Sequence, residues 1–113
     1  MLLFEGEYLN GKKNGKGKEY WSGILIFEGE YSNGTKNGKG KEYGFDKKLE
    51  FEGEYLNGKK NGNGKEYHSN GKLRYEGEYL NNSRNGKGKE YNENGELIFE
   101  GEYLNGLKLD GTL

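Results

Sequence analysis

The sequence Leu49-Glu50-Phe51-Glu52-Gly53-Glu54-Tyr55-Leu56-Asn57-Gly58 recurs along this chain, and its repetition determines the expected architecture. Its core begins five times, at Phe4, Phe27, Phe51, Tyr75 and Phe99, so the spacing is 23 residues once and 24 residues three times. Repetition in this range is typical of solenoids and other stacked arrays. The sequence therefore predicts a single repeat domain over residues 1–113, with units beginning near residues 4, 27, 51, 75 and 99 and a truncated last unit.

Apolar and acidic residues alternate within each copy. Leu49, Phe51, Gly53 and Tyr55 share one parity, whereas the glutamates at positions 52 and 54 have the other. A period of two residues predicts a β-strand, here with rings on one face and carboxylates on the opposite face. We call these the ring face and the charged face.

The fold expected from this pattern is all-β. Residues 9–15 are predicted to form a reversal and residues 16–20 a second strand, and Asn-Gly suits the positive φ angles of tight turns. Connections of about three to six residues permit hairpins but no helical crossover. We expect an open, single-layer antiparallel meander of stacked hairpins, elongated, twisted and roughly 45 Å long. Its rings must lie across the glycines of neighbouring strands, because nothing else covers them.

The second strand of each unit departs from plain alternation. In the sequence Gly40-Lys41-Glu42-Tyr43, counting by two from Gly40 puts Glu42 on the ring face and Tyr43 on the charged face. The same conflict recurs at Tyr20, Tyr67 and Tyr91. We expect a β-bulge between the lysine and the tyrosine that returns the tyrosine to the ring face.

Composition narrows the classes of function. The net charge of −1 gives no overall attraction to nucleic acid or to an anionic membrane, and we expect no nucleic-acid partner. The chain lacks cysteine, which excludes disulfides and thiolate metal sites. Residues 1–5 do not resemble the start of a signal peptide. We expect a cytoplasmic protein, with membrane or cytoskeleton association left open.

No catalytic, metal or cofactor site is predicted. His68 has no cysteine or second histidine to form a metal site with it. Gly15-Lys16-Gly17 resembles a phosphate-binding loop only in composition, because no Gly-Lys-Ser/Thr follows. The paired Glu52 and Glu54 recur in every unit, whereas a catalytic dyad needs one asymmetric environment. We therefore expect no enzyme activity and no cofactor.

Residues 51–64, Phe-Glu-Gly-Glu-Tyr-Leu-Asn-Gly-Lys-Lys-Asn-Gly-Asn-Gly, resemble the MORN repeat (membrane occupation and recognition nexus), and the resemblance recurs over essentially the whole chain. Two departures stand out: tyrosine replaces the family's tryptophan, as at Tyr55, and the family's aromatic residue two positions after the second glycine is absent. The Lys-Glu-Tyr and Asn-Gly of residues 65–71 are similar to MORN-variant repeats of bacterial antitoxin-like proteins. The resemblance implies an open, curved sheet of hairpins that acts as a scaffold or docking surface, without catalytic activity.

The function expected from these features is a non-catalytic scaffold that docks a protein partner on the ring face, since rows of aromatic side chains resemble binding hot spots. The alternative is a module that binds phospholipid headgroups, with Lys12, Lys13, Lys16 and Lys18 as a basic edge, or carbohydrate stacked on exposed tyrosine. The residues predicted to contact a partner are Phe27, Tyr31, Phe51, Tyr55, Tyr75, Tyr79, Phe99 and Tyr103.

The C-terminal segment differs from the other copies. Leu107, Leu109 and Leu113 occupy positions that are polar elsewhere. We expect this segment to cap the last hairpin or to mediate end-to-end self-association.

Overall fold

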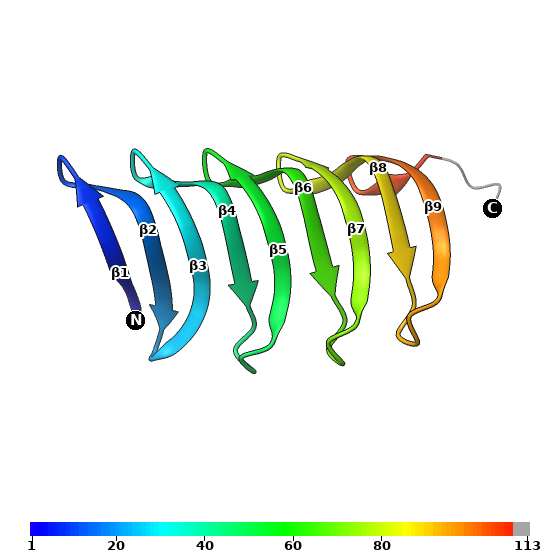
Figure 1. The fold of residues 1–113 in the computed structure, drawn as a ribbon, viewed down its shortest axis with the longest axis horizontal. Coiled ribbons are helices and arrows are strands. Elements are labelled where there is room, and N and C mark those ends of the chain that lie inside the picture. Colours follow the sequence, from blue (N-terminus) through cyan, green and yellow to red (C-terminus); the bar gives the residue numbers. More distant parts are fainter. Residues whose placement is uncertain (110–113) are drawn as a thin grey trace.

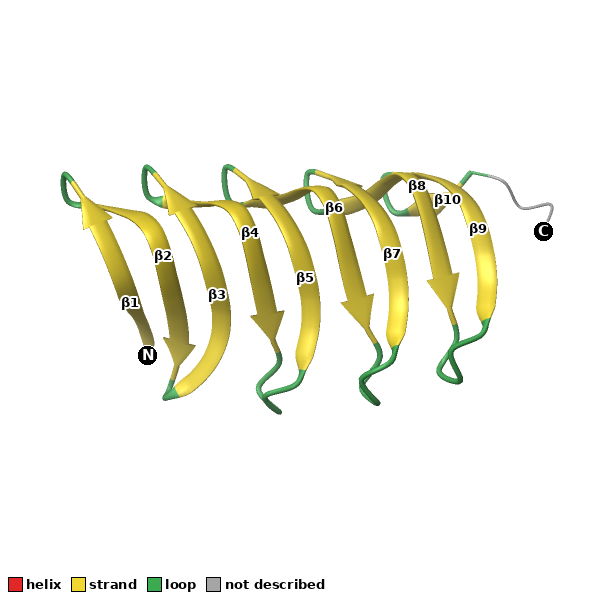
Figure 2. Cartoon of the chain, viewed as in Figure 1, coloured by secondary structure: helices red, strands yellow, loops and turns green. Residues whose placement is uncertain are grey.

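The computed structural model describes residues 1–109, and these form one open sheet of ten antiparallel strands in chain order (Figures 1 and 2). No helix occurs among the described residues. The predicted all-β meander is therefore confirmed. The longest dimension of the molecule is 51 Å. The strands are β1 (Leu2–Leu9), β2 (Lys12–Trp21), β3 (Ile24–Ser32), β4 (Thr35–Tyr43), β5 (Leu49–Leu56), β6 (Lys59–Tyr67), β7 (Leu73–Leu80), β8 (Ser83–Tyr91), β9 (Leu97–Leu104) and β10 (Leu107–Lys108).

Tight turns occupy only two residues at one end of each hairpin. Asn57 and Gly58 have φ angles of +50° and +85°, as both central residues of a type I′ turn require. The second strand therefore begins at once after the turn, and the reversal is shorter than the predicted residues 9–15. The connections at the opposite end span five residues in units two to four, at residues 44–48, 68–72 and 92–96.

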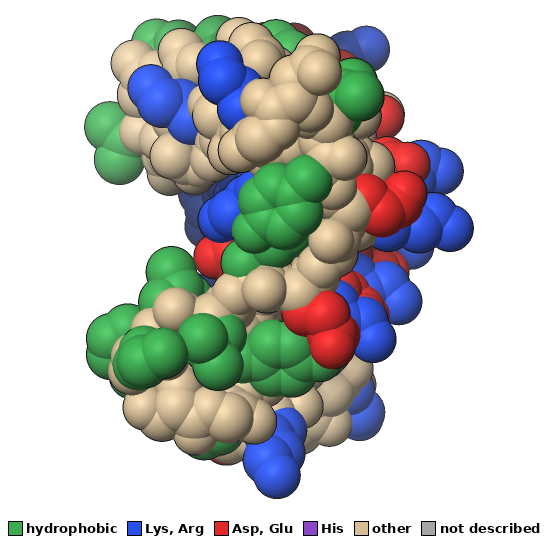
Figure 3. Space-filling model, turned by 90° about the vertical axis from the view of Figure 1, so that its left-hand side faces the viewer, with side chains coloured by type: hydrophobic (Ala, Val, Ile, Leu, Met, Phe, Trp, Pro, Cys, Tyr) green, Lys and Arg blue, Asp and Glu red, His purple; other side chains and the backbone are tan. Residues whose placement is uncertain are grey.

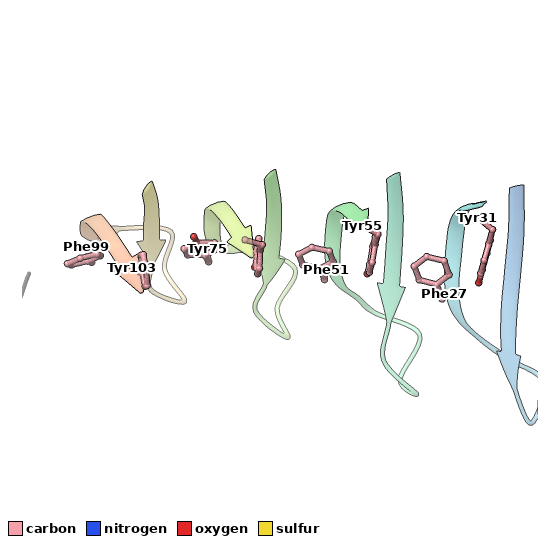
Figure 4. Packing of buried hydrophobic residues seen from close by; sticks show 8 residues of the cluster. Phe27, Tyr31, Phe51, Tyr55, Tyr75, Phe99 and Tyr103 are labelled. Atoms are coloured by element: carbon pink, nitrogen blue, oxygen red, sulfur yellow. The ribbon is translucent and has the colours of Figure 1, made fainter. Parts of the chain in front are cut away.

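The core is a single file of aromatic rings on one face of the sheet (Figure 4). Phe51 packs edge-to-face against Tyr55 of its own unit and Tyr79 of the next, with centroid separations of 5.8 and 5.1 Å. The same alternation runs from Tyr8 to Phe99. Such pairs are each worth about 0.5–1.5 kcal/mol beyond their buried area. The predicted shared face of Phe51, Tyr55, Tyr75 and Tyr79 is thus confirmed.

Glycines form a continuous row beneath these rings. Gly40 pairs with Gly29 on one side and with Gly53 on the other, and this register extends from Gly6 to Gly101. A Cβ atom at Gly40 would lie 2.6 Å from Phe27 Cζ and 2.9 Å from Tyr55 Cε1. The rings therefore lie directly against the backbone, as the sequence predicted.

The predicted bulge is present, but its expected consequence is wrong. The register of β6 and β7 shifts between Glu66 and Tyr67, and the equivalent shift occurs in the other units. Tyr67 nevertheless stays on the charged face, where its hydroxyl donates to Glu52. Glu66 stays on the ring face, where it accepts a hydrogen bond from Tyr79. The bulge leaves the tyrosine on the charged face because each of the two side chains finds a polar partner where plain alternation puts it.

A second irregularity was not predicted. Gly53 pairs with Gly64 and Tyr55 pairs with Lys60, so β6 contains two extra residues between these pairs. Gly62 has a φ of +102° in this bulge, and the Asn63 backbone N–H donates to Glu54. The repeated Asn-Gly-x-Gly in the sequence was the available signal.

The C-terminal segment adds to the sheet. Leu107 and Lys108 form β10, which pairs with Leu104 and Tyr103 of β9. Leu107 and Leu109 are 73% and 56% exposed, so they do not fold over the hairpin as an apolar cap. Leu113 lies outside the described residues, and self-association through this end stays a prediction.

Candidate interaction site

The eight rings predicted to contact a partner are the buried core of the sheet. Their side chains are only 0–5% exposed: Phe27, Tyr31, Phe51, Tyr55, Tyr75, Tyr79, Phe99 and Tyr103. One cation from the following strand covers the phenyl or phenol ring of each unit. Lys60 Nζ lies 4.1 Å from the Phe51 centroid, and the Arg84 guanidinium carbon lies 4.3 Å from the Tyr75 centroid. The role of these rings in docking stays a prediction, but their surfaces are already occupied within the chain.

Carboxylates complete this cover of the ring face. Arg84 pairs with Glu66 at 2.9 Å and with Glu90 at 3.4 Å, and Glu66 also accepts the Tyr79 hydroxyl hydrogen bond. Burial by itself raises the pKa of Glu66, but the hydrogen bonds from Arg84 and Tyr79 outweigh burial and lower it below its usual range. Burial, reinforced by the hydrogen bond to Glu66, raises the pKa of Tyr79 far above 10. The ring face is therefore a layer of internally satisfied charges.

The charged face contains a channel of about 1460 Å³ that runs across the strands. Its floor is the row of nine glycines, and its walls are the residues immediately before and after these glycines, except Glu7. Among the described residues, nine glutamates, seven lysines and Asn63 line these walls. Viewed from the N-terminal end, acidic and basic side chains gather on one side of the molecule, opposite a hollow that contains hydrophobic and basic groups (Figure 3).

Seven of the nine wall glutamates among the described residues accept a hydrogen bond that holds the carboxylate in place. Glu52 accepts the Tyr67 hydroxyl at 2.8 Å, and Glu54 accepts the Asn63 backbone N–H at 2.7 Å. Equivalent bonds fix Glu5, Glu28, Glu30, Glu76 and Glu78. Burial, followed by the hydrogen bond to Glu52, raises the pKa of Tyr67 to about 12. Sequence reasoning missed these tyrosine–glutamate pairs because it placed the tyrosines on the other face.

The wall lysines are not bound in the same way. Lys41 pairs in register with Glu28 and with Glu52, in agreement with the expected arrangement of opposite charges on this face. Among the described residues, however, Lys89 and Glu100 are the only wall residues within salt-bridge distance, at 4.0 Å. The channel thus combines hydrogen-bonded carboxylates with ammonium groups that, apart from that of Lys89, form no salt bridge among the described residues.

The described residues show no candidate metal centre. They contain no group of three histidine, cysteine or acidic side chains that could hold a metal ion. His68 lies in the β6–β7 connection, where its Nε2 is 2.8 Å from the Tyr91 carbonyl oxygen. It links adjacent connections instead of facing the channel. None of the described residues forms a helix long and apolar enough to cross a membrane.

Comparison with known families agrees with this architecture. The family model described as MORN repeat matches four times, over residues 4–23, 27–47, 51–72 and 75–96. This chain belongs to the MORN-repeat family. Each match begins at the first ring residue of a unit, within the first strand, at Phe4, Phe27, Phe51 and Tyr75. MORN repeats generally serve as non-catalytic scaffolds or binding modules. A search of curated proteins found no match.

Proposed function

We propose that this MORN protein is a non-catalytic scaffold that docks a partner protein along the channel on its charged face. The observation that carries the proposal is the continuity of the channel, whose glycine floor stays in register from Gly6 to Gly101. The units contribute equivalent wall residues, with Asn63 in place of one lysine, so a bound segment would meet a repeating surface. Such a surface suits recognition of an elongated partner.

The burial of the rings directs the proposal to this face. Docking directly on Phe51 or Tyr75 would require displacing Lys60 or Arg84, together with the carboxylates that pair with them. Removing one member of such a partly buried ion pair lowers the stability of the folded chain, because the other charge is left without a partner. The channel walls present charged groups that need no such rearrangement.

The alternative ligands receive less support from the geometry. Lys16 and Lys18 lie in the channel walls next to Glu28 and Glu30, so a polyanionic lipid surface would meet carboxylates with every lysine pair. The tyrosines on the charged face donate to glutamates and are partly buried, which leaves little ring surface for stacking a sugar. A protein segment that carries both signs of charge fits better.

Affinity purification from the native source tests the proposal. The wild-type chain should co-purify with a specific partner that a Lys41→Glu, Lys65→Glu variant no longer retains. The matched control is Lys59→Glu, Lys72→Glu, which makes the same charge change at exposed positions outside the walls and should retain the partner. Retention by the wall variant, with loss from a Lys36→Glu, Lys60→Glu variant, would place docking on the ring face instead.

A further inference from the structure

The sign of charge in the channel alternates from strand to strand, and both walls change together. On β5 the glycine is flanked by Glu52 and Glu54, whereas on β4 it is flanked by Lys39 and Lys41. On β6 an asparagine, Asn63, replaces one lysine. Because adjacent strands lie about 4.8 Å apart, groups of like charge recur about every 9.6 Å along the channel.

The carboxylates form the rigid part of this pattern. In the central units, each wall glutamate of β5 and β7 uses one oxygen to accept a hydrogen bond from a tyrosine hydroxyl or a backbone N–H. A carboxylate has about four acceptor sites, so each retains capacity for a cationic donor. A regular array of fixed acceptors favours a partner whose cations have the same spacing.

The shape of the channel limits the conformation of that partner. The residues on either side of a glycine are two apart along a strand, so the walls rise from backbone points only about 6.6 Å apart. An α-helix with side chains is about 10–12 Å wide and would not enter between them. A single extended chain is narrow enough to lie on the glycine floor.

We propose that the channel binds an extended segment of a partner protein with lysine or arginine at every third residue and acidic residues between them. In an extended backbone three residues advance about 10 Å, close to the spacing of the glutamate pairs. Residues three apart point to opposite sides of a strand, and each meets a glutamate because both walls carry the same sign. The acidic residues fall beside the lysine pairs. This assignment rests on the proposed function.

A pair of synthetic peptides tests the spacing directly. The first contains four copies of Arg-Ser-Glu, which extended would span about 40 Å and cover most of the channel. The second has the same composition, with the arginines, serines and glutamates grouped in blocks. We expect the periodic peptide to bind the full chain at least roughly tenfold more tightly in fluorescence anisotropy at low ionic strength.

Two variants assign the binding to the channel. The first variant carries four substitutions that remove the charge from two wall pairs: Glu52→Gln, Glu54→Gln, Glu76→Gln and Glu78→Gln. Its affinity for the periodic peptide should be roughly tenfold weaker than that of the wild type. The second variant, with Glu50→Gln and Glu93→Gln, changes exposed glutamates outside the walls and should not alter the affinity for the peptide. Circular dichroism checks that both variants remain folded.

Several results would overturn the proposal. The channel does not recognise cations at every third residue if the two peptides bind equally or if the wall variant binds the periodic peptide unchanged. The same conclusion holds if a helical peptide of the same composition binds more tightly. If neither peptide binds while the native partner is still lost from the Lys41→Glu, Lys65→Glu variant, the docking function stands and the triplet assignment is wrong. If the native partner is retained by that variant, the docking function itself is wrong, whatever the peptides do.

Discussion

At the scale of single residues, the sheet depends on glycines, which have no side chain. The rings pack against backbone because glycine lies beneath them. On the opposite face the floor of the channel is backbone, because a side chain at these positions would point toward the rings. Glycine therefore makes the core possible, whereas the alternation of side chains along each strand makes the candidate site. Added atoms in a tightly packed core force backbone shifts that typically cost about 1–3 kcal/mol.

Gly53→Ala is predicted to lower the free energy of unfolding by about 2–3 kcal/mol. Its Cβ would lie 2.6 Å from both the Asn63 carbonyl oxygen and the Gly64 Cα, and backbone atoms cannot move aside as a flexible side chain does. Urea denaturation provides the measurement. Gly58→Ala is the control, because Gly58 has open space around it and only its φ of +85° opposes alanine, at a cost of about 1 kcal/mol. Equal losses for the two variants would contradict the packing argument.

Arg84 should tolerate lysine but not methionine. Lys36 and Lys60 occupy the equivalent position in other units, so Arg84→Lys should cost less than about 1 kcal/mol. Arg84→Met leaves Glu66 and Glu90 without their shared cation and should cost about 2–3 kcal/mol at pH 7. Urea midpoints of both variants against the wild type measure the difference.

The cost of Arg84→Met should also depend on pH. The hydrogen bonds to Glu66 hold its folded-state pKa below the unfolded value of about 4.3, so their contribution to stability is complete above that pH. It is lost as the pH falls through the lower, folded-state pKa. The difference between variant and wild type should therefore shrink below about pH 4 and be nearly absent once Glu66 is protonated. A difference that is constant with pH would show that the ion pair does not cause the effect.

At the scale of strands, parity predicted the faces well and the irregularities poorly. Phe51 and Tyr55 lie where alternation puts them, because burial of rings on one side fixes the register of a strand. The prediction that Tyr67 lies on the ring face was wrong, because aromatic residues do not always belong to the core. A tyrosine carries a hydroxyl, and Glu52 satisfies it on the opposite face.

The candidate site was the least predictable part. The sequence predicted a charged face, but alternation cannot show that the Asn63 backbone N–H holds the Glu54 carboxylate in place. This hydrogen bond follows from the bulge at Gly62, which can be recognised only once the paired strand is known. The rings were predicted correctly as a row, yet their exposure was not, because Lys60 and Arg84 reach them from the following strands.

The tyrosine–glutamate pairs should make the sheet sensitive to alkali. Burial and the hydrogen bonds to Glu28 and Glu52 raise the pKa of Tyr43 and Tyr67 to about 12, whereas an unfolded tyrosine titrates near 10. Because the folded pKa is the higher one, this contribution is complete below pH ~10 and is lost as the pH rises through about 12. We expect cooperative loss of the β-sheet signal in circular dichroism over that range, together with the rise in tyrosinate absorbance.

A single substitution tests the same pairs. Tyr67→Phe should lower stability at neutral pH by about 1 kcal/mol and reduce the further loss at alkaline pH, because one titrating pair is gone. Tyr8→Phe is the matched control, since Tyr8 is 59% exposed and should change neither value. Equal behaviour of the two variants would contradict a stabilising role for the pairs.

At the scale of the whole molecule, the fold is a row of units that contact only their neighbours. Each strand pairs with the strands before and after it in the chain. Further bonds join consecutive units at both ends of the hairpins. Gly58 N donates to the Lys36 carbonyl at 2.8 Å, and Lys48 Nζ donates to the Ser69 carbonyl at 2.9 Å. Stability should therefore be a sum of unit and interface terms.

Deleting residues 51–74 should leave a folded, shorter sheet. The deletion removes one period of 24 residues and joins Glu50 to Tyr75, so Tyr79 takes the place of Tyr55 above Gly40 and Glu42 takes the place of Glu66 beside Arg84. The longest dimension should decrease by about 10 Å in small-angle scattering, and the denaturant m-value should fall by roughly a fifth. Deleting residues 51–62 is the control. It removes half a period, sets Lys65 against Gly40 and Gly64 against Lys41, and interrupts the file of rings, so it should abolish cooperative unfolding. A whole-period deletion that unfolds the chain would show that its stability depends on interactions beyond neighbouring units.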